Sequence, residues 1–271
     1  MKPNKLHPSD GINNIFTKLG SLSLFFPAYN DAPALPGLIE KAFHYASECA
    51  ENFEVIIVND ASQDDTDSII EALRSRFGPR LSVVRHATNR GYGGALQSGF
   101  RASTMEFVFY TDGDAQYDMA DLPKLVERMK PGIGLVNGYK ISRSDAWYRV
   151  MLGHVYLFVV RHLFWLKIRD VDCDFRLIRS SVLRDMELST DSGAICVELV
   201  RRIQDTGCGM VEVPVRHLPR LHGSSQFFRF ANLWRMIVAV QRLFLSRIFS
   251  RSPMAAKRPA VNTVRPGEHL E

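Results

Sequence analysis

Two carboxylates directly follow an apolar run in the stretch Tyr110-Thr111-Asp112-Gly113-Asp114-Ala115-Gln116. Hard oxygen atoms at this spacing suit Mg²⁺ or Mn²⁺, with the phosphate oxygens of a bound molecule completing the coordination shell. A metal ion held there would neutralise a leaving diphosphate. Asp and Gly are also common in solvated turns, so Asp112 and Asp114 alone leave a structural interpretation open. An EF-hand loop is excluded, because Tyr117 stands where that loop requires glycine.

Three other apolar runs also end in side chains that could contact a ligand. They are followed by Pro27-Ala28-Tyr29-Asn30-Asp31, by Asn59-Asp60-Ala61-Ser62 and by Asn89-Arg90-Gly91-Tyr92-Gly93-Gly94. The third segment is neither a Walker A loop, since it lacks Gly-Lys-Ser/Thr, nor a dinucleotide-binding fingerprint. Taken with the Asp-Gly-Asp segment, these ends would place carboxylates, an aromatic ring and glycines along one cleft.

The apolar runs alternate with helix-like segments through the first half of the chain. We expect strands at residues 21–26, 54–59, 81–85, 107–111 and 133–137, with Pro27 ending the first, and helices at 35–50, 64–77, 94–103 and 119–129. Near-continuous apolar strands that alternate with helices predict an α/β fold, with a mostly parallel sheet covered on both faces. Ligands bind such sheets outside the carboxyl ends of the strands, where the polar segments lie.

In this order, the four polar segments resemble the motifs of the inverting family 2 glycosyltransferases with a GT-A fold, over about residues 22–229. Three later segments resemble the polyprenyl-phosphate branch, typified by dolichol-phosphate mannosyltransferase and bacterial undecaprenyl-phosphate glucosyltransferases. They are Gly138-Tyr139-Lys140 with Arg143 and Arg149, then Asp170-Val171-Asp172-Cys173-Asp174-Phe175-Arg176, then Glu212-Val213-Pro214-Val215-Arg216-His217. The resemblance implies a hexosyltransferase with a nucleotide-sugar donor, a lipid-phosphate acceptor and Mg²⁺ or Mn²⁺.

The resemblance also implies roles at the donor. The positions concerned are Pro27, Tyr29, Asp31, Asp60, Asp112, Lys140 and Arg149. The first three would border the nucleotide base, Asp60 would hydrogen-bond the base or the ribose, and Asp112 would face the ribose and the metal. The two cations, together with Arg143, would meet the donor diphosphate or the acceptor phosphate.

Metal ligands and catalytic groups follow from the same resemblance. Asp112, Asp114 and Gln116 would be metal ligands, and Asp112, Asp114 and Arg143 would carry catalysis. The acceptor phosphate would meet Arg220, Gln226 and Arg229.

Three positions depart from the family pattern. Asp31 replaces the usual Glu, which shortens its reach to the base, and Ala61 replaces a Gly, which we expect to tighten the turn only slightly. Gln226 stands where the polyprenyl-phosphate branch has a phosphate-binding Lys, so Arg220 or Arg229 would have to compensate.

The expected reaction is a single displacement with inversion at the anomeric carbon. An anionic lipid phosphate needs no strong base, so metal and arginines would stabilise the charge. A hydroxyl acceptor needs a carboxylate to take its proton, for which Asp172 and Asp174 are candidates, while Asp170 would fix the local backbone. The alternatives are such a hydroxyl-directed glycosyltransferase and a non-catalytic nucleotide-binding module at the membrane surface.

Charge and apolar patterns predict where the protein acts. The net charge is +5, yet the segment from Val213 to Gly267 holds ten Lys/Arg and no Asp or Glu, which favours an anionic partner. Helix-like residues 145–166 and 227–249 mix apolar side chains with arginines, a pattern of interfacial rather than membrane-spanning helices. A basic-edged helix packed on the domain explains the second segment equally well. The basic tail lacks a nucleic-acid reader motif, so we expect no nucleic-acid partner.

The expected organisation is an N-terminal extension (1–20), a GT-A domain (21–226), an amphipathic helix (227–251) and a disordered basic tail (252–271). The N-terminus has no apolar segment typical of a signal peptide, and the four cysteines show no metal-ligand spacing. We therefore expect free thiols and a cytoplasmic protein, peripheral on the inner face of the membrane. Nothing in the sequence indicates an oligomeric state.

Overall fold

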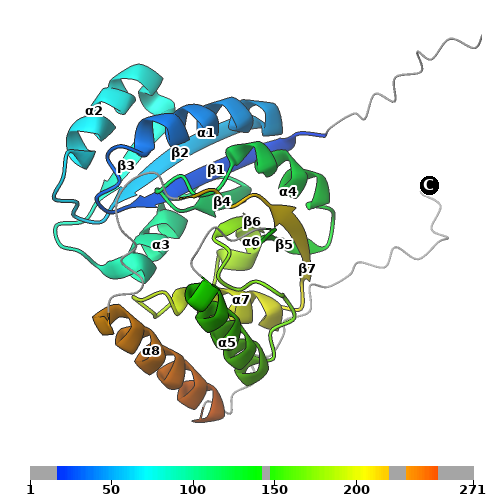
Figure 1. The fold of residues 1–271 in the computed structure, drawn as a ribbon. Coiled ribbons are helices and arrows are strands. Elements are labelled where there is room, and N and C mark those ends of the chain that lie inside the picture. Colours follow the sequence, from blue (N-terminus) through cyan, green and yellow to red (C-terminus); the bar gives the residue numbers. More distant parts are fainter. Residues whose placement is uncertain (1–16, 142–146, 220–229, 250–271) are drawn as a thin grey trace, which may run out of the picture.

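A computed structural model of the 271-residue chain describes residues 17–141, 147–219 and 230–249. Its centre is a seven-stranded sheet with the order β3-β2-β1-β4-β6-β5-β7 (Figure 1). The strands are β1 (Leu19–Ala28), β2 (Ala50–Asn59), β3 (Leu81–Arg85), β4 (Phe107–Thr111), β5 (Ile133–Lys140), β6 (Phe175–Arg179) and β7 (Gly209–Val215). β6 pairs antiparallel with β4 and β5, and the other neighbours pair in parallel.

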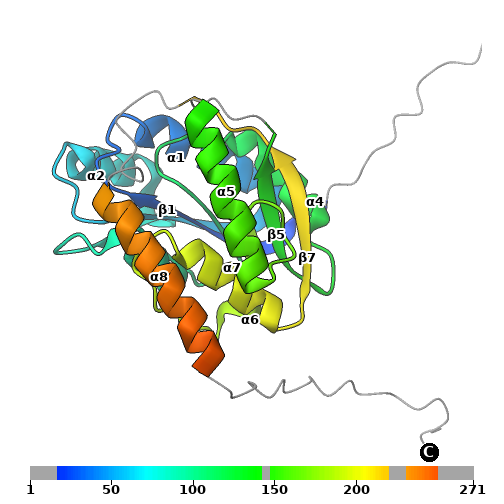
Figure 2. The ribbon, with the colours of Figure 1, turned by 60° about the horizontal axis from the view of Figure 1, so that its bottom comes forward.

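Helices cover both faces of the sheet. They are α1 (Leu35–Cys49), α2 (Thr66–Phe77), α3 (Gly91–Ala102), α4 (Leu122–Arg128), α5 (Trp147–Phe164), α6 (Ser180–Leu183), α7 (Ile195–Asp205) and α8 (Phe230–Phe249), with short 3₁₀ turns η1 (Gly78–Arg80) and η2 (Met119–Asp121). α1, α2 and α4 lie on one face, and α3, α5, α7 and α8 lie on the other (Figures 1 and 2). The predicted α/β fold with a mostly parallel, doubly covered sheet is confirmed.

The central strands are largely apolar because both of their faces are buried. In β1, Leu22, Leu24 and Phe26 pack under α1, whereas Phe25 points into the opposite core with α3 and α7. Successive side chains of a strand alternate between faces, so one run of apolar residues fills two cores. This double burial fixes the register of the central strands, and with it the position of every loop at their carboxyl ends.

Several expected boundaries were wrong. β1 runs from Leu19 to Ala28 and includes Pro27, so it begins within the expected N-terminal extension and does not end at the proline. α3 begins at Gly91 rather than at residue 94. The expected helix at 119–129 is divided into η2 and α4, because the Asp118 side chain accepts a hydrogen bond from the Ala120 backbone and starts a separate turn.

β6 brings a second loop to the ligand edge of the sheet. Because β6 is antiparallel, its first residues lie beside the last residues of its neighbours: Phe175 pairs with Thr111, and Arg176 pairs with Asn137. The loop that precedes β6, with Asp172 and Asp174, therefore meets the segment that follows β4. Sequence periodicity did not predict this strand.

α5 and α8 lie side by side, in the lower part of Figure 1 and in front of the sheet in Figure 2. The inner face of α5 buries Leu157, Val160 and Phe164, and α8 buries Met236 and Val240 in the same core. α8 is therefore packed on the domain along one face, the alternative left open by its sequence. No helix in the described part of the chain combines the length and apolar character that crossing a bilayer requires.

Candidate active site

Three loops at the carboxyl ends of β1, β2 and β4 each contain a residue in the left-handed region. Their φ angles are +60° at Asn30, +60° at Ala61 and +57° at Ala115. Residues with a Cβ rarely adopt this conformation, and such strain clusters at functional sites. The sequence predicted that Ala61 would tighten the turn only slightly. In the structure this alanine instead occupies a left-handed conformation that favours glycine.

The end of β1 ties the two neighbouring loops together. The Asp60 amide donates to the Ala28 carbonyl at 3.0 Å, and the Gly113 amide donates to the Pro27 carbonyl at 3.0 Å. A Cβ on Gly113 would lie 2.5 Å from the Pro27 oxygen, so this approach requires glycine. Both carboxylate-bearing loops are therefore held at fixed positions relative to β1.

Asp112 is the most strongly perturbed carboxyl group of the Asp-Gly-Asp segment. Its Oδ1 accepts a hydrogen bond of 2.7 Å from the Tyr92 hydroxyl. Burial raises the pKa of Asp112 well above its usual value, and the negative charges of Asp174 and Asp114 raise it further. Carboxylates that repel one another in a buried place attract a cation.

The other two expected metal ligands are also held in defined positions. Asp114 Oδ1 accepts from the Gln116 amide at 3.0 Å, which closes a local turn. The Gln116 side chain donates through Nε2 to the Leu218 carbonyl at 3.2 Å, so its amide nitrogen is engaged and its oxygen is the atom suited to a cation. Two carboxylates and one amide oxygen fit a hard divalent ion whose shell is completed by phosphate oxygens.

Within the described ranges, no group of three or more His, Cys, Asp or Glu side chains is arranged to hold a metal ion by itself. The fit therefore depends on the amide oxygen of Gln116 and on ligands supplied by a bound molecule. Such incomplete protein ligation is usual for Mg²⁺, which binds through one or two carboxylates together with substrate phosphates.

The loop before β6 adds a second set of ionisable groups. Lys140 Nζ donates to the Asp172 carbonyl at 2.6 Å and lies 3.6 Å from Asp170 Oδ1. Burial alone would lower the pKa of Lys140, but the surrounding anionic groups outweigh it and raise the pKa. Asp170 accepts backbone hydrogen bonds from Lys140 and Asp172, as expected of a residue that fixes the local backbone. Burial also raises the pKa of Asp172 to about 7.

A buried arginine, Arg176, contacts Asp174 and helps to fix its position. The Arg176 side chain is fully buried, donates to Asn137 Oδ1 at 2.7 Å and lies 3.4 Å from Asp174 Oδ1. Tyr110, in β4, also contacts both Arg176 and Asp174. A buried charge persists only when it is paired and hydrogen-bonded, so this network fixes the position of Asp174 beside Asp112.

The N-terminus of α3 is held by a crossing loop. The Gly93 amide donates to the Asp191 carbonyl at 2.9 Å, and a Cβ on Gly93 would lie 2.1 Å from the Thr190 oxygen. Glu198 braces this loop by accepting hydrogen bonds from the Ser189 and Thr190 amides. The glycines therefore permit close contact of loop and helix, and that contact places Tyr92 over Asp112.

The expected site residues divide into two groups. At one edge of the sheet the structure places Pro27, Tyr29, Asp31, Asp60, Asp112, Asp114, Gln116 and Lys140. Arg143, Arg220, Gln226 and Arg229 lie outside the described residues, and only the backbone of Arg149 is described, in the first turn of α5.

Sequence reasoning missed the groups that act through tertiary contact. These are Tyr92, Tyr156, His86, Ser98, Tyr110, Asn137 and Arg176. Tyr156 has a buried hydroxyl with no hydrogen-bond partner among the described residues, and burial, followed by the charge of Asp172, raises its pKa. The one available signal was Arg176, a charge inside an otherwise apolar strand pattern.

Residues 23–186 match the family described as Glycosyl transferase family 2. Because this match covers more than half of the chain, the chain belongs to glycosyltransferase family 2, as its motifs predicted.

Two curated relatives share the name undecaprenyl-phosphate 4-deoxy-4-formamido-L-arabinose transferase. The protein of Edwardsiella ictaluri is 26% identical over 216 residues, which are 78% of this chain and 64% of the relative. The protein of Pseudomonas aeruginosa is 28% identical over 208 residues, 76% of this chain and 60% of the relative. The chain thus spans less than two thirds of the length of these relatives.

Solved structures share the fold. Glucosyl-3-phosphoglycerate synthase from Mycobacterium tuberculosis, in complex with Mn²⁺, UDP and glucosyl-3-phosphoglycerate, has a TM-score of 0.61 at 16% identity, covering 83% of this chain and 80% of that chain. A mannosyltransferase from Pyrobaculum calidifontis, in complex with GDP-Man and Mn²⁺, has a TM-score of 0.57 at 21% identity, covering 89% and 79%. At these identities the likeness establishes the GT-A type fold, which was predicted.

Proposed function

We propose that this chain transfers a sugar from a nucleoside-diphosphate sugar to a polyprenyl phosphate, with inversion and with a divalent metal ion. The observation that carries the proposal is the pairing of Asp112 with Asp114 at the ligand edge of the sheet, where burial and neighbouring charges raise the pKa of Asp112. Mg²⁺ or Mn²⁺ bound there would relieve this repulsion and supply positive charge for a leaving diphosphate. The solved relatives with Mn²⁺ and UDP or GDP-Man support the same assignment.

The names of the curated relatives support a polyprenyl-phosphate acceptor. The acceptor side of the site offers Lys140 and the buried hydroxyl of Tyr156, near Asp172 and Asp174. A phosphate oxygen is already anionic, so the residues have to hold and orient it rather than remove a proton. The Tyr156 hydroxyl is a donor suited to that task.

A hydroxyl acceptor is the second candidate, and one observation favours it. Burial first, and then the charges of Asp170 and Asp174, raise the pKa of Asp172 to about 7. A carboxyl group that titrates near neutral pH is suited to general-base catalysis. Replacement of Asp172 by Asn distinguishes the two acceptors: transfer to a hydroxyl would fall by about 10²-fold or more, whereas transfer to a phosphate would not depend on that base.

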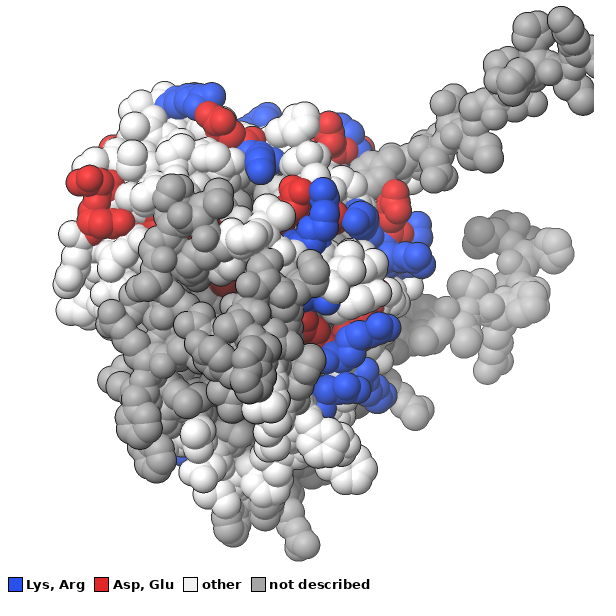
Figure 3. Space-filling view, viewed as in Figure 1, with Lys and Arg blue, Asp and Glu red and all other residues white. Residues whose placement is uncertain are grey.

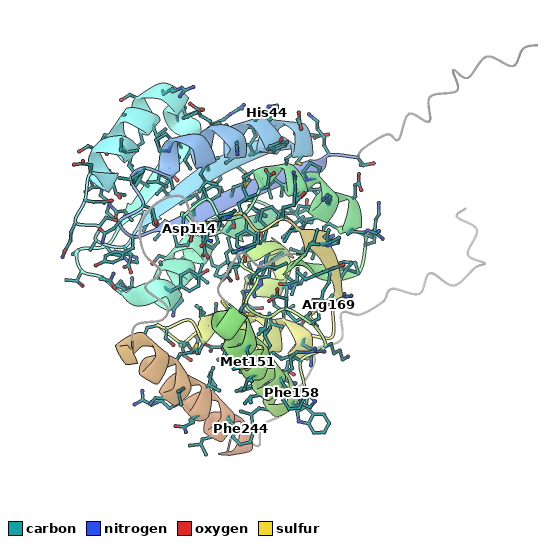
Figure 4. All side chains as sticks on the ribbon, viewed as in Figure 1. His44, Asp114, Met151, Phe158, Arg169 and Phe244 are labelled. Atoms are coloured by element: carbon teal, nitrogen blue, oxygen red, sulfur yellow. The ribbon has the colours of Figure 1, made fainter. Side chains whose placement is uncertain are left out.

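We also propose that the protein binds the cytoplasmic surface of a membrane through α5 and α8. Along one face of α5, four apolar side chains are 49–64% exposed, namely Met151, Val155, Phe158 and Val159. This spacing forms a continuous stripe on a helix. Figure 4 shows Met151 and Phe158 along α5, with Phe244 of α8 nearby.

The charged side chains of α5 and α8 are all basic. No Asp or Glu occurs between residues 146 and 169 or in α8, while Arg161, His162 and Arg242 are exposed. In Figure 3 the described surface in the lower part of the view carries no acidic residue, whereas both signs of charge mix in the upper part. Trp165, the residue directly after α5, adopts the left-handed conformation, and 75% of its surface is exposed. Exposed aromatic and cationic side chains around an apolar stripe suit an anionic lipid surface.

The metal-dependent donor site is tested by calorimetry with UDP and GDP, with and without Mn²⁺. Asp114→Asn should weaken nucleotide binding in Mn²⁺ by about tenfold or more and leave metal-free binding unchanged. Asp185→Asn, at an exposed position outside the site, is the matched control. Equal Mn²⁺ dependence in wild type and Asp114→Asn would contradict the metal assignment.

Membrane binding is tested by sedimentation with vesicles that contain anionic lipid. Phe158→Ser should reduce the bound fraction, and Phe158→Leu should retain it, because only the first removes apolar area from the stripe. Equal sedimentation of the two variants would contradict the role of α5.

A further inference from the structure

A closed ring of polar groups lies beneath the loop that follows β2. Asp60 Oδ1 lies 2.6 Å from His86 Nδ1, and His86 Nε2 lies 2.8 Å from Ser98 Oγ. The Arg90 guanidinium reaches Ser98 Oγ at 3.4 Å, and the Arg90 backbone amide donates to Asp60 Oδ1 at 2.8 Å. The side chains of His86 and Asp60 are only 4% and 5% exposed.

The ring defines which atom carries each proton. Arg90 has only donors, so Ser98 Oγ accepts from it, and the Ser98 hydroxyl keeps its own hydrogen to donate to His86 Nε2. The Asp60 carboxylate can only accept, so His86 carries a proton on Nδ1 and donates it to Asp60 Oδ1. The hydrogen bond made by one ring nitrogen thus sets the role of the other.

The two hydrogen bonds that described residues donate to the Asp60 carboxylate end on the same oxygen. Oδ1 accepts from His86 and from the Arg90 amide, and no described residue donates to Oδ2. A carboxylate has acceptor capacity on both oxygens, so Oδ2 remains available to a ligand. Because His86 and the Arg90 amide grip Oδ1 from two elements, the carboxylate cannot turn to exchange its oxygens without breaking both bonds.

The backbone around β3 and α3 sets the positions of the side chains in this ring. The His86 amide donates to the Asn59 carbonyl at 3.0 Å, which extends the β2–β3 ladder by one residue beyond β3. Ser98 lies on the buried side of α3, and Arg90 is the residue before its first turn. A Cβ on Gly94 would lie 2.6 Å from Arg90 Cβ, so this glycine makes room for the Arg90 side chain to fold back toward Ser98.

Asp60, His86 and Ser98 are hydrogen-bonded in the same order as the residues of a hydrolytic Asp–His–Ser triad. Their surroundings exclude hydrolytic chemistry. Ser98 is 8% exposed in the middle of α3, and its oxygen already accepts from Arg90. A nucleophile needs an accessible oxygen next to a place for an acyl group. The hydrogen bonds of the ring therefore orient the Asp60 carboxylate.

We propose that His86, held by Ser98, is a positioning residue that fixes Asp60 so that Oδ2 accepts the imino N–H of the donor's nucleobase. This inference rests on the proposed function, in which a nucleoside-diphosphate sugar is the donor. Uracil, thymine and guanine present such an N–H, whereas adenine and cytosine present a lone pair at the corresponding ring nitrogen. A fixed carboxylate facing a lone pair leaves both groups without a partner, so the ring selects the first three bases.

The test compares binding of UDP, GDP, CDP and ADP, each with Mn²⁺, to wild type and variants by calorimetry. Wild type should bind UDP or GDP at least tenfold more tightly than CDP and ADP. His86→Ala should reduce this preference by about tenfold, which corresponds to one hydrogen bond to a charged group. His86→Asn, whose amide can still donate to Asp60 Oδ1, should retain most of the preference. Affinity for inorganic pyrophosphate with Mn²⁺ should be the same in all variants, because the ring does not contact the phosphates.

Ser98→Ala provides a second probe if His86→Ala does not fold, and it should reduce the base preference in the same direction. A base preference unchanged in His86→Ala or Ser98→Ala would overturn the positioning role alone. Wild-type protein that binds UDP and GDP no better than CDP and ADP, yet still transfers sugar, would also overturn this inference and leave the proposed function intact. Wild-type protein that binds none of the four nucleotides would overturn both.

Discussion

Asp121→Asn should destabilise the protein strongly, because the buried Asp121 side chain joins the segment after β4 to the end of β7. Its side chain is fully buried and accepts from the Arg216 backbone amide at 2.7 Å and from Arg216 Nη2 at 2.9 Å. Lys124 Nζ lies 2.7 Å from the same carboxylate. These contacts join η2 to the end of β7, where Leu218 and Gln116 also exchange hydrogen bonds.

The expected magnitude follows from the arrangement of donors. Oδ2 faces the Arg216 amide, and Oδ1 faces Arg216 Nη2 and Lys124 Nζ. Asn has one oxygen and one NH₂ group, so either orientation points a donor at a donor. One charged hydrogen bond is lost and one buried donor is unsatisfied, a loss of about 3 kcal/mol. The midpoint of thermal unfolding should fall by roughly 8 °C for a domain of this size.

The effect should also depend on pH. Burial alone would raise the pKa of Asp121, but the hydrogen bonds from Arg216 and Lys124 outweigh it and lower the pKa. A lowered folded-state pKa contributes stability above the unfolded value of about 3.9, and that stability is lost as the pH falls below it. Urea unfolding at pH 7, 5 and 3.5 should therefore show a constant difference between wild type and Asp121→Asn at pH 7 and 5, and a smaller one at pH 3.5.

Asp118→Asn is the matched control. Asp118 Oδ2 lies 2.9 Å from Arg216 Nη1, but an Asn can retain the cap to the Ala120 amide, and both charged side chains reach solvent. Its loss should stay below about 1 kcal/mol. Asp121→Asn with a loss as small as that of Asp118→Asn would refute the reasoning.

Three further predictions concern other parts of the molecule. Ala61→Gly should raise the free energy of unfolding by about 1 kcal/mol in urea, because glycine relieves the left-handed strain; a loss of stability would contradict this. Gly93→Ala should lower the thermal midpoint by several degrees because its Cβ would meet the Thr190 oxygen, whereas Gly37→Ala, with nothing within 4 Å, should be neutral or stabilising; equal effects would disprove the contact. Asp172→Asn should gain about 2 kcal/mol of stability relative to wild type between pH 5 and pH 7, because the carboxyl ionises near pH 3.9 in the unfolded chain and only near pH 7 in the folded protein. A constant difference over this range would contradict the raised pKa.

The first half of the fold could be predicted because its strands are buried on both faces. Runs such as those of β1 and β4 are largely apolar, and the polar residues that follow them, including Asp112 and Asp114, lie at the ligand edge. β6 has only five residues with Arg176 inside, and β7 contains Pro214, so neither shows a simple pattern. Their register depends on partners distant in sequence.

The supporting groups of the site could not be predicted for the same reason. Tyr92 and His86 are single residues whose roles arise from contacts across 20 and 26 positions of the chain. The sequence predicted that α5 is a helix, but it did not predict which apolar side chains of α5 are exposed. Which face of a helix is covered depends on the elements packed against it. The left-handed conformation of Ala61 likewise depends on the turn that its loop has to make.

The most direct test of the central claim is glycolipid formation. Purified protein is incubated with a panel of UDP-, GDP- and TDP-sugars, undecaprenyl phosphate and Mn²⁺, beside Asp114→Asn and the Asp185→Asn control. The account predicts a sugar–phosphate–lipid product whose anomeric configuration is inverted relative to the donor, and which is lost with Asp114→Asn or on chelation of the metal. Product formed equally well by Asp114→Asn, or wild type that binds donor and transfers sugar only to hydroxyl acceptors, would contradict it.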